Sequence, residues 1–568
     1  MKNKNYPYYE TTVIENFRSM VENVAEKYPD KCAFAYRKNP HDENATEITY
    51  AQTKEDIRNY GTALVKLGCR EKYCAIIGSS SIGWIYTYLT LMATGAITVP
   101  IDKALPADDM ESILETAECE YIFYGSLETE KLEEIKKRNK FAKKYICFDG
   151  APNAEDITME MLISEGKTLF DGGDNSYYDY EIDAEKLASI VFTSGTTGSG
   201  KGVMLSQKNI ASDMTQGMYL FNIYRNTVDV LPPHHTYCST VLFVGHYSQG
   251  CRIYISSGLK YMLSEFKEQK PEHLVLVPLF VETIYKKIWA TAQKQGKEKI
   301  LRNMMKVSNG LRKVGIDMRR KFFSSIHDMF GGNLKMIICG GAALNQDIID
   351  TFDAIGITIL NGYGISECAP LVSCNRNEYR KKGSVGIPIV GEEVKIENPD
   401  ENGEGEILVK GPNVMLGYFK NPEATEKAFD EDGFFRTGDY GRIDEDGWIY
   451  ITGRLKNLII LSNGKNVYPE EIENEISRIY GVNEVVVYAG ESKTKNKEVI
   501  VAEIYPDKEV LESKGITDLQ GYFTDEVKKI NNRSVSYKAV GMIKIRDTEF
   551  EKNTSRKITR FKINKSID

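Results

Sequence analysis

The chain has 568 residues, of which 42% are hydrophobic and 27% are charged. This composition is ordinary for a soluble globular protein, and the length suggests about three to four domains, some of which can share a core. The formal net charge of −8 is mild for this length, so the overall charge gives no reason to expect nucleic acid or an anionic membrane as a partner.

Cysteine usage and the N-terminal sequence favour a cytoplasmic protein. The ten cysteines are scattered without a C-x-x-C pair, which is typical of free thiols in a reducing compartment. The start of the chain, MKNKNYPYYETTVIENF, lacks the basic head and apolar core of a signal peptide. The six histidines show no zinc-ligand spacing, so we expect no zinc site.

In chain order, the first half alternates short apolar runs with helical periodicity, which predicts a parallel sheet covered by helices. The strand candidates are YCAIIGS, AITVPI, CEYIFYG and KYICFDG. The region from Ala75 to Ile101 contains no charged residue and is long enough to span a bilayer. Because it is interrupted at GSSS and ends in a strand-like run, we expect a strand, a helix at about 81–94 and a second strand instead.

A glycine-rich loop follows. TSGTTGSGKG, residues 193–202, matches Gly-x4-Gly-Lys, but Gly202 stands where a Walker loop needs Ser or Thr for Mg²⁺. KLASIVF before the loop and GVMLS after it both resemble strands, which predicts a hairpin in place of a strand-to-helix turn. The loop offers hydroxyls and backbone N–H groups suited to ATP phosphates, with Lys201 as a point charge. A solvated surface turn is the alternative. The hydroxyl residues are Thr193, Ser194, Thr196, Thr197 and Ser199.

Three later apolar runs are HLVLVP, KMIICGG and ITILNGYG, and the last two end in glycine. They predict further strands of a sheet whose ligands lie beyond the carboxyl ends. Between them, the segment from Tyr285 to Gly332 has helical periodicity and carries twelve Lys or Arg against three acids. Such a segment is usually a solvated helical insertion. A role at a membrane surface or in acyl-chain entry is the alternative.

From Gly383 to Gly453 the sequence pattern changes to short strand-like runs separated by turns rich in Gly, Asp and Asn, which indicates a small β region. After Arg454 the chain resumes mixed α/β character, with VYPEEIENEISRIYGV as an amphipathic helix and VNEVVVYAG as a strand. We therefore place a domain boundary at 453–456, between a domain of residues 1–453 and a smaller one of residues 454–568.

The loop and seven further motifs, taken in order, resemble those of the acyl-adenylate-forming superfamily, which contains acyl-CoA synthetases, non-ribosomal peptide adenylation domains and luciferases. The resemblance implies a large N-terminal domain of parallel sheets layered with helices, with a small β region, and a small mobile α+β C-terminal domain. It also implies that a carboxylate attacks the α-phosphate of ATP to give acyl-AMP and pyrophosphate. The motifs are LPPHHTYCS, ICGGAAL, NGYGISE, GSVGIPIVG, FFRTGDYGRIDEDGWIYITGR, NLIILSNGKNVYPEEIE and NTSRKITR.

The resemblance assigns Mg²⁺ to Glu367, assisted by the hydroxyl of Thr193, and such sparse protein ligation suits this ion. Tyr363 is expected to stack on adenine, with Gly341 and Ala342 lining the other face. The remaining nucleotide ligands implied are Ser194, Gly195, Thr196, Thr197, Gly198 and Lys201 of the loop, and Asn361, Gly362, Gly364 and Ser366 of NGYGISE.

Three more residues match family positions around the nucleotide and the acid. Asp439 in TGD is expected to accept from both ribose hydroxyls. Arg454 is expected to reach the ribose or the phosphate. His235 matches a position near the acyl carboxylate, and a satisfied core histidine is the alternative.

Lys557 in NTSRKITR matches the mobile lysine that bridges the carboxylate and the α-phosphate. Arg556 stands where the family often has glycine, so Arg556 is the alternative carrier of this role. Lys456 falls on the hinge about which the C-terminal domain rotates between adenylation and thioester formation.

The long insertion before KMIICGG, the stretch VPLFVETIY and the tail EFEKNTSRKITR resemble the medium- to long-chain fatty acyl-CoA synthetase branch. We therefore expect a fatty acid as substrate, with ATP, Mg²⁺ and coenzyme A, and no transmembrane span. Peripheral membrane contact stays the alternative role for the basic insertion. The alternatives are acyl carrier protein as the acceptor, an aryl acid as substrate, a P-loop kinase or ATPase, and an inactive lipid-binding relative.

Overall fold

The computed structural model describes residues 7–150, 156–193, 200–461, 465–491, 499–552 and 558–567. Contacts within the chain group it into two compact units. Unit 1 comprises Met1–Glu393, Val409–Phe435 and Asp446–Trp448, and unit 2 comprises Val394–Leu408, Arg436–Glu445 and Ile449–Asp568. Each unit contains both sheets and helices, which confirms the predicted α/β fold class.

An eight-stranded sheet of unit 1 carries the glycine-rich loop. From β8 outward to β7 its neighbouring strands are parallel, whereas β9 and β19 are antiparallel to their neighbours at the other edge. The order is β19 (Gly417–Tyr418), β9 (Lys201–Ser206), β8 (Leu187–Thr193), β4 (Ile97–Ile101), β3 (Tyr73–Ile77), β5 (Tyr121–Tyr124), β6 (Lys144–Cys147) and β7 (Ile157–Thr158).

The uncharged segment folds as the sequence predicted, as β3, a helix α3 (Ile82–Thr94) and β4. The side chain of Ser81 accepts from the backbone N–H of Trp84 at the start of α3, and Gly95 ends the helix with φ 81°. Nearly every residue of α3 is buried, which explains why it is apolar all round. Among the described residues, no helix is both long and apolar enough to cross a bilayer.

A five-stranded sheet of unit 1 positions the NGYGISE motif. β12, β13 and β14 are parallel, and β15 and β16 continue the sheet in antiparallel fashion. A third sheet has the order β10 (Asn226–Asp229), β11 (Arg252–Ile255), β1 (Cys32–Tyr36) and β2 (Thr46–Thr49). The strands of the five-stranded sheet are β12 (His273–Leu276), β13 (Met336–Cys339), β14 (Thr358–Gly364), β15 (Leu371–Cys374) and β16 (Ile387–Pro388).

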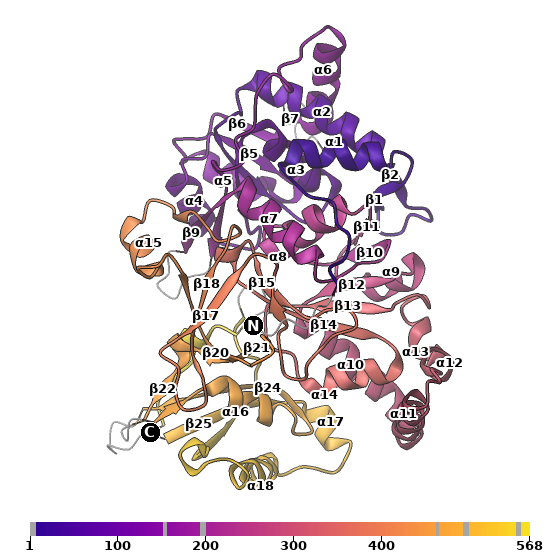
Figure 1. Cartoon of the computed structure of the whole chain (residues 1–568), viewed down its shortest axis with the longest axis vertical. Helices are drawn as coiled ribbons and strands as arrows, with labels where there is room; N and C mark the ends of the chain where they lie inside the picture. Colours follow the sequence, from indigo (N-terminus) through magenta and orange to yellow (C-terminus); the bar gives the residue numbers. More distant parts are fainter. Residues whose placement is uncertain are drawn as a thin grey trace. The chain divides into compact units, whose positions relative to one another are not determined.

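The basic segment between β12 and β13 is helical, as predicted. Its helices α11, α12 and α13 lie together at one edge of unit 1 (Figure 1). α14 (Gln346–Ile355) then leads into β14. The helices of the segment are α10 (Pro278–Lys294), α11 (Glu298–Lys313), α12 (Arg319–Phe322) and α13 (Ser324–Asp328).

Unit 2 is built mainly on two sheets. One has the order β17 (Glu393–Glu397), β18 (Gly405–Lys410), β20 (Phe435–Ile443) and β21 (Ile449–Arg454). The other joins β24 (Val482–Gly490), β25 (Val499–Pro506) and β26 (Met542–Ile545), and α16 (Pro469–Ile476) and α18 (Leu519–Asn531) share its core. The helix predicted in VYPEEIENEISRIYGV and the strand after it are therefore confirmed as α16 and β24. The division into domains of residues 1–453 and 454–568 concerns motion and stays a prediction.

All ten cysteines lie in described residues and are free thiols. Nine of them are buried, and Cys32 is half-buried. The cysteines occur between Cys32 and Cys374, so the chain after Cys374 contains none.

Candidate active site

The strands on either side of the glycine-rich loop form the predicted hairpin. β8 and β9 pair in antiparallel fashion with Thr193 opposite Lys201, and the Thr193 hydroxyl donates to the Lys201 carbonyl at 3.3 Å. The loop itself lies outside the described residues. The chain therefore leaves the loop as a strand and not as a Walker-type helix. The predicted phosphate ligands that lie outside the described residues are Ser194, Gly195, Thr196, Thr197 and Gly198.

Gly202, which replaces the Walker hydroxyl, is a buried strand residue with no room for a side chain. A Cβ there would lie 2.9 Å from Ile190 Cγ2 and 3.2 Å from Phe419 Cβ. The Gly202 carbonyl accepts from the backbone N–H of Phe419 at 2.8 Å, next to the pairing of β19 with β9. This position therefore cannot hold a metal-binding hydroxyl without displacing its neighbours.

Lys201, Tyr418 and Glu367 form one cluster at the edge of the eight-stranded sheet. The Lys201 ammonium lies 4.6 Å from the centroid of the Tyr418 ring, within cation–π range. The Tyr418 hydroxyl donates to Glu367 Oε1 at 3.0 Å. Burial raises the pKa of Tyr418, and the Glu367 carboxylate adds to the rise, so the phenol stays protonated and remains a donor. The structure thus brings together the predicted phosphate lysine and the predicted metal ligand.

The turn that carries Glu367 is tightly packed. Glu367 lies in a 3₁₀ turn, Ser366–Cys368, directly after β14. A Cβ on Gly364 would lie 2.2 Å from the Pro370 carbonyl oxygen, so only glycine fits at this crossing. The backbone N–H of Ile365 donates to the same carbonyl at 2.8 Å. The requirement for glycine in NGYGISE is therefore structural at Gly364.

The buried side chain of Asn413 holds this turn in place through hydrogen bonds to backbone carbonyls. The Asn413 amide donates to the carbonyls of Cys368 at 3.0 Å and Leu371 at 2.9 Å. Asp213 Oδ1 accepts from the Leu371 N–H at 3.0 Å. The Asn413 amide also lies 3.4 Å from Asp213 Oδ1 and 3.4 Å from Glu392 Oε1. Burial raises the pKa of both acids, and the charge of Asp213 adds to the rise at Glu392.

The residues predicted to surround adenine meet at the carboxyl ends of β13 and β14. Cys339 pairs with Asn361 across these parallel strands, so the segment after Cys339 lies beside NGYG. Gly341, with φ 89°, and Ala342 are both exposed, while Tyr363 is buried. Exposed backbone beside an aromatic ring suits a planar ligand. Their contact with adenine stays a prediction.

His235 begins a short helix, α8 (Thr236–Ser239), at the same end of the sheet. Its Nδ1 accepts from the backbone N–H of Tyr237 at 3.1 Å. The Tyr237 hydroxyl lies 3.2 Å from the Leu276 carbonyl and 3.1 Å from the Ile338 carbonyl, and it donates to both. The LPPHHTYCS motif is thereby fixed to the ends of β12 and β13. Contact of His235 with an acyl carboxylate stays a prediction.

Asp229, at the end of β10, ties this motif to a neighbouring turn. It is fully buried, and its Oδ1 accepts from the Leu231 N–H at 3.0 Å and from the Cys238 thiol at 3.5 Å. Its Oδ2 accepts from the Ser80 hydroxyl. Burial raises the pKa of Asp229 to about 6, although these three donors oppose the rise.

In unit 2 Asp439, predicted to bind the ribose, and Arg454, predicted to reach the ribose or the phosphate, form an ion pair. Asp439 on β20 lies opposite Arg454 on β21, and Arg454 Nε lies 2.8 Å from Asp439 Oδ1. The Asp439 side chain is 2% exposed and that of Arg454 is 43% exposed. The pair therefore has a fixed buried carboxylate and an arginine that solvent or a ligand can still reach.

Lys456 lies in the 3₁₀ turn Leu455–Asn457 that follows β21. The next residue is anchored, because the Asn457 amide donates to Glu470 Oε1 at 2.6 Å. Lys557 and Arg556 lie outside the described residues. The hinge role and the role of the tail lysine stay predictions.

The oxygen atoms available as metal ligands in unit 1 suit Mg²⁺ bound together with a nucleotide. Glu367 offers one carboxylate, whose Oε2 has no hydrogen bond within the described part of the chain, and Thr193 offers a hydroxyl. In the same part of the chain, no group of three or more His, Cys, Asp or Glu side chains could enclose a metal ion. A site with so few protein ligands fits Mg²⁺, which keeps waters and substrate phosphates as its other ligands.

Three residues of the site were not predicted from the sequence, namely Tyr418, Asn413 and Asp229. Tyr418 and Asn413 lie in GPNVMLGYFK, between recognised motifs. The signal available for Tyr418 was the short run LGYF, which contains the edge strand β19 next to β9. Asn413 and Asp229 act through buried hydrogen bonds between distant segments, which no local pattern reports.

Comparison with known proteins places the chain in a family. A model of the AMP-binding enzyme family matches residues 21–419, which is more than half of the chain, and the chain belongs to this family. The family membership that the sequence motifs predicted is thereby confirmed.

Among its relatives, the chloroplastic "Long-chain-fatty-acid–[acyl-carrier-protein] ligase AEE15" of Arabidopsis thaliana is 27% identical, over 85% of this chain and 75% of that protein. "Long-chain-fatty-acid–CoA ligase 5" of Rattus norvegicus is 28% identical, over 82% of this chain and 72% of that protein. The solved structure of the anthranilate CoA ligase AuaEII in complex with anthranoyl-AMP matches with a TM-score of 0.77 at 19% identity, over 99% and 98% of the two chains. That likeness confirms the fold.

Proposed function

We propose that this AMP-binding enzyme activates a carboxylic acid with ATP to give an acyl-AMP and pyrophosphate, and then transfers the acyl group to the thiol of coenzyme A with release of AMP. The observation that carries the proposal is the cluster in unit 1, in which Tyr418 contacts Lys201 at 4.6 Å and Glu367 at 3.0 Å. A cation and a carboxylate from distant segments, held beside a glycine-rich hairpin, suit a nucleotide triphosphate.

The chemistry requires neutralisation of charge, because both reactants are anions. Lys201 supplies a positive charge next to the hairpin, and we assign Lys557 to bridging the attacking carboxylate and the α-phosphate. When bound, Mg²⁺ would withdraw charge from the phosphate oxygens, and Glu367 and Thr193 would hold it. Tyr418 keeps the Glu367 carboxylate in one orientation, and Asn413 holds the turn behind it.

The remaining ligands position the nucleotide. We assign Tyr363, Gly341 and Ala342 to adenine, and Asp439 with Arg454 to the ribose. Asp439 is suited to this task because a carboxylate accepts from two hydroxyls at once, and its ion pair with Arg454 fixes its orientation.

We assign a medium- or long-chain fatty acid as the substrate. The rat relative is named a long-chain-fatty-acid–CoA ligase, and the insertion at 285–332 resembles that branch. The Arabidopsis relative is named a ligase for acyl carrier protein, so carrier protein is the second candidate acceptor. We place the enzyme in the cytoplasm, in keeping with its ten free thiols.

We further propose that the C-terminal domain of residues 454–568 alternates between two orientations about Lys456. One orientation delivers Lys557 for adenylation, and the other admits the thiol for thioester formation. Lys456→Pro is expected to spare adenylation and to slow thioester formation, since proline restricts the backbone change that rotation needs. Unimpaired overall turnover in this variant would contradict the hinge.

The deciding experiment measures pyrophosphate release from ATP with a panel of medium-chain, long-chain and aryl acids. Each acid is tested alone, with coenzyme A and with acyl carrier protein. We expect release with fatty acids and thioester product with coenzyme A. Release with aryl acids only would refute the fatty-acid assignment, and no release with any acid would refute the proposed activity.

A further inference from the structure

The outer face of α11 combines lysines with exposed aliphatic side chains in a regular pattern. Ile300, Val307 and Val314 follow one another at intervals of seven residues, and their side chains are 55%, 56% and 72% exposed. Residues seven apart lie almost above one another on a helix, so the three form a row about 21 Å long. The opposite side of α11 packs on the core through Leu301, Met304 and Met305.

A second row of lysines runs beside the aliphatic row with the same spacing. Lys299, Lys306 and Lys313 are all exposed, and none has an acidic partner in the described part of the chain. The exposed positions between the two rows, Asn303 and Gly310, carry no charge. We call these eight residues the outer face of α11: Lys299, Ile300, Asn303, Lys306, Val307, Gly310, Lys313 and Val314.

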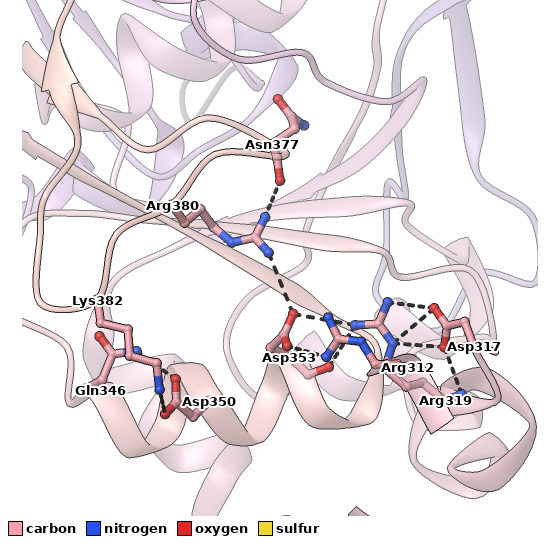
Figure 2. Close-up of polar contacts among 9 residues, drawn as sticks. All are labelled: Arg312, Asp317, Arg319, Gln346, Asp350, Asp353, Asn377, Arg380 and Lys382. Atoms are coloured by element: carbon pink, nitrogen blue, oxygen red, sulfur yellow. Dashed lines mark hydrogen bonds and ion pairs between the residues drawn. The ribbon is translucent and has the colours of Figure 1, made fainter. Parts of the chain in front are cut away.

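The arginines of the same segment are engaged elsewhere. Arg312 and Arg319 both bind Asp353 of α14, with nitrogen–oxygen distances of 2.6 and 3.4 Å, and Arg380 reaches the same carboxylate at 3.6 Å. Arg319 also pairs with Asp317 at 2.7 Å. Figure 2 shows these three arginines converging on Asp353. Ion pairs therefore fasten α11 and α12 to α14, while the lysines remain available to an external partner.

Arg302 is also engaged within the segment. It pairs with Glu298 at 3.0 Å and lies over the Trp289 ring at 4.3 Å. Glu298 is the acid nearest to the lysine row in sequence, and Arg302 neutralises it. The outer face of α11 is thus positive over its whole length.

We propose that the outer face of α11 docks on an anionic lipid bilayer. A straight row of Ile and Val fits a fluid apolar phase without needing a shape-matched pocket, and flanking lysines place their ammonium groups among lipid phosphates while their methylenes follow the apolar layer. Each lysine near an anionic surface contributes about fivefold in partition, or about a hundredfold for three. The surface goes beyond the proposed function and is independent of it, because docking requires neither ATP nor acid.

Co-sedimentation of the full-length protein with lipid vesicles tests the proposal. The vesicles contain phosphatidylcholine alone or phosphatidylcholine with phosphatidylglycerol, and no nucleotide is added. We expect binding to the anionic vesicles only, weakened by salt. The triple variant Lys299→Glu, Lys306→Glu and Lys313→Glu is expected to lose at least about a hundredfold in partition. Ile300→Ser, Val307→Ser and Val314→Ser are expected to lose about tenfold and to keep the salt dependence.

A matched control changes the same charge on another exposed surface of unit 1. Lys137, Lys140 and Lys144 are exposed and have no acidic partner in the described part of the chain, so their replacement by glutamate should leave vesicle binding unchanged. Equal binding by the α11 variants and the control would overturn the proposal, as would a wild type that ignores anionic vesicles. Binding of acyl carrier protein in place of vesicles, lost in the lysine variant, would assign the face to a protein partner and also overturn it. Thermal unfolding of every variant confirms that it is folded.

Discussion

Replacing Tyr418 with phenylalanine removes the hydroxyl that donates to Glu367 Oε1 at 3.0 Å and keeps the ring next to Lys201. A hydrogen bond to a charged group contributes about 1.5–3 kcal/mol. Glu367 is half-buried, so water replaces part of this bond, and the lower value of about 1.5 kcal/mol applies. That value corresponds to about a tenfold loss, within the range found when the partner of a metal ligand is removed.

The assay is acid-dependent pyrophosphate release as a function of Mg²⁺ concentration. If Tyr418 orients Glu367 for the metal ion, the Mg²⁺ concentration for half-maximal rate rises about tenfold, and excess Mg²⁺ restores most of the rate. Tyr522→Phe is the matched control, because it removes a hydroxyl that donates to the Tyr480 carbonyl at 3.0 Å, within unit 2. A loss that is the same at every Mg²⁺ concentration, or no loss at all, would refute the reasoning.

Three further predictions concern other parts of the site. Lys557→Ala should abolish adenylation yet spare thioester formation from supplied acyl-AMP; equal loss of both half-reactions would count against the tail lysine. Asp229 has its pKa raised to about 6 by burial, so the stability gained by its protonation is complete below about pH 4 and is lost as the pH rises through 6. A rise of two pKa units corresponds to about 3 kcal/mol. Urea unfolding of wild type and Asp229→Asn should therefore show that the difference between their free energies of unfolding changes by about that amount over this pH range. Parallel pH curves for the two proteins would contradict the prediction. Gly202→Ser should destabilise the protein by about 1–3 kcal/mol, because the new Cβ would lie 2.9 Å from Ile190 Cγ2; unchanged urea unfolding with full pyrophosphate release would show that the strand tolerates a Walker-like residue.

The spacing of apolar residues, and the glycine and serine residues that interrupt them, predicted most of the local structure. The uncharged segment at 75–101 was predicted as strand, helix and strand because GSSS interrupts it and it ends in a strand-like run, and β3, α3 and β4 confirm this. The strand after the glycine-rich loop was also predicted correctly, because GVMLS is a short strand-like run bounded by glycine.

The side-chain contacts that hold the site together could not be predicted from the sequence. Tyr418 reaches Glu367 only because β19 pairs with β9, an antiparallel pairing between segments far apart in the chain. Asn413 joins the Glu367 turn to two buried acids. Such pairings depend on tertiary packing, which a single sequence does not report. The tail lysine was identified by its motif, and Lys557 stays a prediction.

The distribution of thiols makes this chain convenient for following motion by spectroscopy. Nine of the ten cysteines are buried and the chain after Cys374 has none, so soluble maleimide dyes have almost no native site to modify. A cysteine introduced at the exposed Lys528 of α18 and another at Lys137 would accept a donor and an acceptor fluorophore with little background. Energy transfer between the two dyes, recorded with ATP and then with coenzyme A, would report a rotation of the C-terminal domain without altering any residue of the site.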